Sequence, residues 1–198
     1  MKSYSCYFIK SNDSEALRAK LGPTDSRSLQ PVEGSEWIPW RFHRDDEAPD
    51  DEILNGEGSI ADQQSSRLGE EVIFLFADRS SDAFVYEHAR DGQLIRKLVW
   101  FPMLDDDWTA GWTHASGESE PWEATLFEPN RLSDVLDTER SAFEERGALD
   151  EFTAQELKIR RMWIEKRIET GNTFPRADAT VATLVEEHFG LVLPRRGK

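Results

Sequence analysis

The side chains most suited to acid–base or metal chemistry are four histidines: His43, His88, His114 and His188. No two of them have the short spacing that is typical of metal ligands. His88 and His114 both fall in a predicted sheet and could meet there. With a carboxylate from Glu87, Glu118 or Asp105 they would form an acid–base pair or a metal site. The simpler interpretation, which we favour, is that His88 is a sheet residue near a hairpin end and His114 a loop residue.

Other catalytic or cofactor signatures are weak or missing in the sequence. The nucleophile motif Gly-x-Ser-x-Gly does not occur. Gly56-Glu57-Gly58 follows no predicted strand, so it predicts a loop rather than a nucleotide site. The basic cluster within residues 158–167 is mixed with glutamates on a predicted helix and indicates a salt-bridged surface. We therefore predict no catalytic residue, no metal and no cofactor.

The charge of the chain is strongly negative and unevenly distributed. The formal net charge is −15; residues 131–198 hold 12 basic and 13 acidic side chains, which leaves −14 for residues 1–130. Such a charge repels nucleic acid and anionic membrane surfaces. It could attract basic proteins or metal ions, or simply keep the protein soluble, which is the commoner reason for such a charge. Six acids lie within residues 45–52, but the ligand alternation and turn glycine of a calcium loop are missing. We expect a solvated, mobile acidic loop over residues 43–68.

Six tryptophans between residues 37 and 122 could fill a core that is poor in aliphatic side chains or anchor an interface. Trp100 and Trp122 are expected in the core. Trp37, Trp40 and Trp112 stand among polar and turn residues, so we predict that they are exposed anchors. The acids expected to steer a basic partner toward them include Asp45, Asp46, Asp105 and Asp106.

The environment of the protein is predicted from its cysteine content and its N-terminus. Cys6 is the single cysteine, which excludes an internal disulfide, and it lies in an apolar run that favours a buried thiol. Residues 1–20 contain no apolar run long enough for a signal peptide or a membrane span. We expect a cytoplasmic protein.

The elements that would position these side chains begin with a strand at residues 4–9 and a helix that ends at Gly22-Pro23. Residues 72–77 predict a buried strand. Residues 83–88 and 93–101 predict a hairpin with a two-residue turn at Asp91-Gly92. That turn pairs positions whose numbers sum to 183, which places Glu87 opposite Arg96. A further strand is expected over residues 108–115.

From Asn130 onward the sequence predicts helices, over residues 133–146, 153–170 and 178–189. The middle helix has two apolar stripes: Phe152, Ile159, Met162 and Trp163 on one side, and Leu157, Ile164 and Ile168 on the other. The second stripe could support a homodimer. His188 is expected to pack on the inner face of the last helix.

These elements predict an α+β fold in a single domain, 1–198. We expect an antiparallel sheet of about four to five strands with the C-terminal helices packed on one face. The side chains expected to be largely buried are Phe74, Phe76, Phe84, Trp100, Trp163 and Phe189.

Two motifs resemble a group of uncharacterised bacterial proteins. Asp91-Gly92-Gln93-Leu94-Ile95-Arg96 matches their Asp-Gly-x-Leu-x-Arg hairpin, and residues 117–123 match their Gly-Glu-x-x-Pro-aromatic-Glu turn. The closing sequence 188–191 is also similar to their last helix. The resemblance implies a bacterial source and a compact domain; because that group has no assigned activity, it implies no catalytic residue.

The sequence leaves two classes of function open. The first is a non-enzymatic interaction protein, such as an inhibitor or immunity-type partner of a basic toxin. The second is a small hydrolase or metal-dependent enzyme that uses His88, His114 and nearby carboxylates.

Overall fold

A computed structural model describes residues 2–44, 60–102 and 110–194. Its centre is a six-stranded antiparallel sheet with the strand order β2-β1-β3-β4-β5-β6. The predicted acidic site residues Asp45, Asp46, Asp105 and Asp106 lie outside the described residues. The strands are β1 (Ser3–Lys10), β2 (Trp37–Arg44), β3 (Val72–Asp78), β4 (Ala83–Arg90), β5 (Gln93–Pro102) and β6 (Ala110–Gly117).

The α+β class and the antiparallel sheet are confirmed, but the sheet has six strands where four to five were expected. The additional strand is β2, which contains Pro39. Proline donates no backbone hydrogen bond, so it is tolerated at a sheet edge, and β2 is an edge strand. Part of the predicted acidic loop is also structured, since its last nine residues form helix α3 (Ile60–Leu68).

The hairpin between β4 and β5 turns at the predicted residues but changes register above the turn. Ala89 pairs with Leu94 as expected, whereas His88 pairs with Arg96, so Ile95 is an extra residue in β5. This β-bulge moves every later pair by one position, and Glu87 faces Lys97 instead of Arg96. The predicted Glu87–Arg96 pair is therefore wrong.

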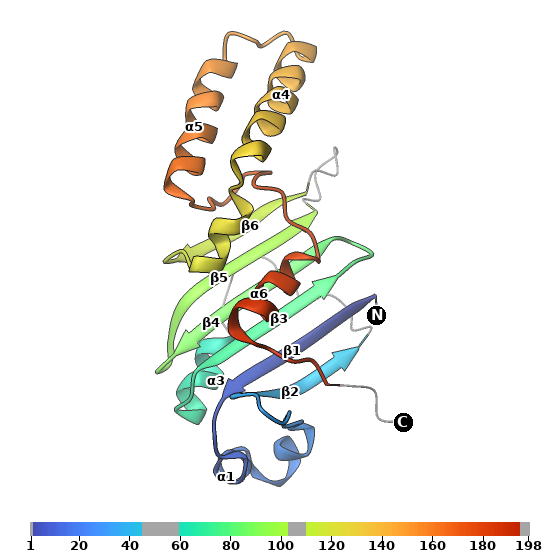
Figure 1. Ribbon diagram of the computed structural model, residues 1–198, viewed down its shortest axis with the longest axis vertical. Helices are drawn as coiled ribbons and strands as arrows, with labels where there is room; N and C mark the ends of the chain where they lie inside the picture. The colour runs from blue at the N-terminus through green and yellow to red at the C-terminus, as the bar shows by residue number, and fades with distance from the viewer. Residues whose placement is uncertain (1, 45–59, 103–109, 195–198) are drawn as a thin grey trace.

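Helices cover both faces of the sheet, which corrects the prediction that they lie on one face (Figure 1). One face packs against α1 (Ser14–Asp25), the short η1 turn (Ser26–Ser28) and α3. The other face packs against the 3-10 helix η2 (Pro121–Leu126) and α6 (Val181–Phe189). We call these the α1/α3 face and the α6 face. Each has its own cluster of buried apolar side chains, because successive strand residues point to opposite sides.

Helices α4 (Pro129–Glu145) and α5 (Phe152–Glu165) form an antiparallel hairpin that extends past the β6 edge (Figure 1). α5 is shorter than predicted: Lys166 adopts a left-handed conformation, with φ 49°, and ends it. Ile168 therefore turns back into the core instead of continuing the predicted second stripe. The predicted core is confirmed for Phe74, Phe76, Phe84, Trp100 and Trp163, whereas Phe189 is only partly buried.

Candidate functional site

The two histidines that sequence reasoning could place in one site lie on opposite faces of the sheet. His88 points to the α6 face, where its ring contacts Phe189. His114 pairs with Val99, which belongs to the α1/α3 face, and its Nε2 bonds the Ser116 hydroxyl. Burial and the nearby Lys97 ammonium lower the pKa of His114. Because the sheet separates the two rings, a shared metal or acid–base site at His88 and His114 is excluded.

The three tryptophans predicted as exposed anchors are buried. Trp37 packs against Phe189 on the α6 face, and Trp40 belongs to the cluster under α1. Trp112 packs edge-to-face on Trp100 and donates from Nε1 to the Pro175 carbonyl at 2.9 Å. All three are at most 1% exposed, so they are core residues in this structure and offer no contact surface. The polar residues around them in the sequence misled the prediction, because a tryptophan with one bonded N–H is readily buried.

The structure reveals a buried polar network around His88 on the α6 face. The Nδ1 atom of His88 lies 2.5 Å from Glu120 Oε1, and its Nε2 lies 2.8 Å from Glu71 Oε1. The Tyr86 hydroxyl also donates to Glu120, as does Trp122 Nε1 at 3.0 Å. The imidazole of His88, on β4, thus connects two acids from other segments. One is Glu71, directly before β3, and the other is Glu120, after β6.

A second carboxylate three residues further on extends this network. Arg96 donates from Nε and Nη2 to the two oxygens of Glu123, at 2.8 and 2.6 Å, and both side chains are buried. Glu123 also accepts from the Glu120 backbone N–H, at the start of η2. Residues 117–123 therefore supply one fully buried acid, Glu123, and one partly buried acid, Glu120. The spacing of Glu120 and Glu123, together with polar side chains at alternate strand positions, was the sequence signal that could have revealed them.

The electrostatics of the network suit a structural role. Burial raises the pKa of Glu120, but the hydrogen bonds from His88 and Tyr86 outweigh it and leave that pKa below its ordinary value. The pKa of Glu71 is lowered in the same way, by Arg90 and His88 against the effect of burial. For Glu123 burial prevails and the pKa is raised despite Arg96. Each acid is held by specific donors, which fixes the segments together rather than presenting a reactive group to solvent.

The α1/α3 face has its own buried ion pair, in the register that the bulge creates. Lys97 Nζ lies 2.8 Å from Glu87 Oε1, and both side chains are buried. The other oxygen, Oε2, accepts from the backbone N–H groups of Ile60 and Ala61 at 3.0 and 2.9 Å. Glu87 therefore also caps the first turn of α3 and attaches it to the sheet.

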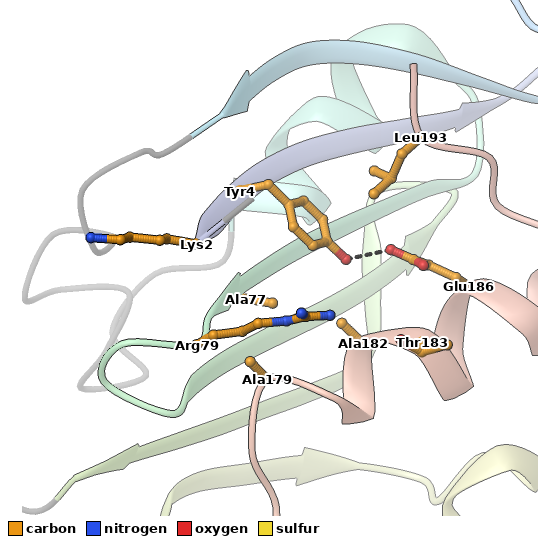
Figure 2. A pocket seen from close by; sticks show the side chains of 9 residues that line it. All are labelled: Lys2, Tyr4, Ala77, Arg79, Ala179, Ala182, Thr183, Glu186 and Leu193. Atoms are coloured by element: carbon orange, nitrogen blue, oxygen red, sulfur yellow. Dashed lines mark hydrogen bonds between the residues drawn. The ribbon is translucent and has the colours of Figure 1, made fainter. Parts of the chain in front are cut away.

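Two surface features remain. A pocket of about 200 Å³ opens between β1, β3 and α6, and Figure 2 shows the side chains that line it. The α4–α5 hairpin exposes Leu157 and Ile164, which are 66% and 81% exposed. Within residues 2–44, 60–102 and 110–194 there is no group of three metal-ligating side chains placed to hold an ion. No helix of these segments has the length and apolar character needed to cross a membrane.

No family model, curated protein or solved structure matches the chain.

Proposed function

We propose that this protein is a non-enzymatic interaction protein that binds a basic protein partner, in the manner of an inhibitor or immunity protein. The observation that supports this best is the stripe formed by Leu157 and Ile164 on α5. These are the two most exposed of the large apolar side chains in the described part of the chain. They stand seven residues apart, which is about 10 Å along a helix and places them on one side of it.

The surroundings of this α5 stripe resemble the rim of an interface. Arg160 pairs with Glu156 at 2.6 Å and Arg161 pairs with Glu169 at 2.8 Å. The stripe is therefore an apolar centre flanked by charges that already have partners on the same chain. An apolar centre with a polar rim is the usual anatomy of a protein interface. Its position on a hairpin that extends past the sheet leaves room for a partner (Figure 1).

The charge of the molecule indicates the chemistry of that partner. Helix α4 carries five acidic and two basic side chains, a net of −3. Residues 45–59 and 103–109 add ten acids and no base to the sequence. A basic protein would be attracted by this charge, whereas a second copy of the chain would be repelled by its own −15. These charges favour a basic protein over the homodimer that the second predicted stripe suggested.

A capture experiment with the full tagged chain tests this proposal. We expect a basic protein from the source cells to be retained at low salt and released as the salt concentration rises. Changing Leu157 and Ile164 together to Gln removes apolar area without adding charge or disfavouring the helix, and should abolish capture. The matched control is Ser141→Gln on the exposed side of α4, which should retain the partner. Capture that survives the double change, or self-association of the chain alone, would contradict the proposal.

A further inference from the structure

The pocket between β1, β3 and α6 is not used by the proposed function. Its apolar wall consists of small side chains, Ala77, Ala179 and Ala182, together with Leu193. Its volume of about 200 Å³ is below the range of about 300–1,000 Å³ that is usual for ligand pockets, so it suits a small molecule.

One side of this pocket presents positive charge. Lys2 and Arg79 both line it, and Figure 2 shows the Arg79 side chain extending along the pocket toward Ala182, whereas the Lys2 ammonium points away from Tyr4 and Glu186. The guanidinium of Arg79 forms no hydrogen bond or ion pair with the residues that the structure describes. A guanidinium carries paired N–H donors in a planar fork that matches the two oxygens of a carboxylate.

The neighbouring wall of the pocket carries a carboxyl group, that of Glu186. The Tyr4 hydroxyl donates to Glu186 Oε1 at 2.5 Å, as the dashed line in Figure 2 marks. This bond orients the carboxyl group of Glu186 and occupies one of its oxygens. In the described segments no donor is bonded to the other oxygen, Oε2. The Thr183 hydroxyl also lines the pocket. A ligand that filled the pocket would meet an acceptor here and the guanidinium of Arg79.

We propose that this pocket binds a small carboxylic acid that also carries a hydrogen-bond donor, namely an α-amino or α-hydroxy acid. The ligand carboxylate bonds Arg79, its amino or hydroxyl group donates to Glu186 Oε2, and its short carbon chain contacts the alanine wall. Two charged anchors of opposite sign separated by a small apolar wall select molecules with both groups over simple anions.

Calorimetric titration of the full chain tests this with four probes: L-alanine, L-lactate, propionate and inorganic phosphate. We expect L-alanine or L-lactate to bind at least about tenfold more tightly than propionate, which lacks the donor, and than phosphate. Arg79→Ala should weaken that binding by about tenfold or more, while Arg140→Ala, an exposed arginine on α4, should not change it.

Nuclear magnetic resonance provides a second readout, because addition of the bound probe should shift the amide signals of Ala179 and Thr183. The proposal is wrong if neither L-alanine nor L-lactate binds at about 10 mM, a concentration well above a millimolar dissociation constant. It is also wrong if phosphate or propionate binds as tightly, or if folded Arg79→Ala binds like the parent.

Discussion

His88 and Glu120 join the middle of the sheet to the segment that follows its last strand. Their side chains meet at 2.5 Å, although 32 residues separate them in the sequence. The opposite ring nitrogen of His88 bonds Glu71, so the imidazole connects three separate segments. His88, a candidate catalytic residue in the sequence, is thus enclosed by the carboxylates of Glu71 and Glu120 and by the ring of Phe189. We expect it to contribute mainly to the stability of the fold.

Two glutamates, Glu120 in this network and Glu186 outside it, should change the stability with pH in opposite directions. The pKa of Glu120 is lowered in the folded state, so its stabilising effect is present above the unfolded pKa and is lost as the pH falls through the folded pKa. The difference in unfolding free energy between the parent and Glu120→Gln should therefore grow as the pH rises from about 3 to about 5. Urea denaturation across that range measures it.

Glu186 supplies the contrast, because burial raises its pKa despite the hydrogen bond from Tyr4. A raised pKa favours the folded state below the unfolded value, and this contribution is lost as the pH rises through the folded value. The difference between the parent and Glu186→Gln should therefore shrink as the pH rises above about 4.5. Parallel profiles for the two variants would show that the two carboxyl groups do not have these opposite environments.

The bulge at Ile95 predicts which charges interact across the hairpin. Removing one member of the buried Glu87–Lys97 pair leaves the other without its main counter-charge and should cost about 3–5 kcal/mol. The double change Glu87→Leu with Lys97→Met should cost less than the sum of the two single changes. A cycle between Glu87 and Arg96, which face opposite sides of the sheet, should be additive within about 0.5 kcal/mol. Strong coupling between Glu87 and Arg96 would contradict the bulge and support the register predicted from the sequence, in which these two residues pair.

The same bulge brings the backbone close to Gly117. A Cβ atom at Gly117 would stand 2.0 Å from the Ile95 carbonyl oxygen, and its φ of +86° disfavours other residues. Gly117→Ala should combine the left-handed cost of about 1–2 kcal/mol with a clash of about 1–3 kcal/mol. Gly34→Ala is the matched control, because Gly34 has a similar φ of +78° but open space around it. Equal losses of unfolding free energy in the two variants would mean that the close approach is absent.

The buried tryptophans and the exposed helix stripe should respond differently to truncation. Trp40→Ala should cost about 3–5 kcal/mol, because the ring is fully buried and its N–H donates to the Asp25 carbonyl. Ile164→Gln should change the unfolding free energy by no more than about 0.5 kcal/mol, since the side chain is 81% exposed. Thermal or urea unfolding measures both. A Trp40→Ala variant as stable as the parent would contradict the burial of Trp40 and support the prediction from the sequence that it is a surface residue.

The sequence predicted the parts of the fold that depend on local signals. The Asp91-Gly92 turn, the buried strand at 72–77 and the antiparallel sheet follow from turn chemistry and from runs of apolar residues. The bulge could not be predicted, because Leu94, Ile95 and Arg96 have the sequence of a regular strand. The extra residue is recognised only from the pairing with β4 and from the close approach of Ile95 to Gly117. Coverage of the second face was missed because α3 is a weakly apolar helix whose first turn is capped by a distant residue, Glu87.

The site was harder to predict than the fold, for a related reason. Glu71, His88 and Glu120 are far apart in the sequence, and their contacts arise only when β3, β4 and the segment after β6 pack together. The exposed positions Leu157 and Ile164 were recognised as a separate stripe from helical periodicity alone. Ile168 was wrongly included, because the left-handed turn at Lys166 gives no strong sequence signal.

Site-specific photo-crosslinking is the most direct measurement of the proposed interaction. A photoreactive residue in place of Ile164 should crosslink to a basic protein in the source cells, and the same residue in place of Ser141 should not. The yield at position 164 should fall as the salt concentration is raised during binding in lysate. Crosslinking to a basic protein from position 164 alone is the result we predict. No crosslink at position 164, equal crosslinking at position 141, or a crosslink to a second copy of the chain would contradict it.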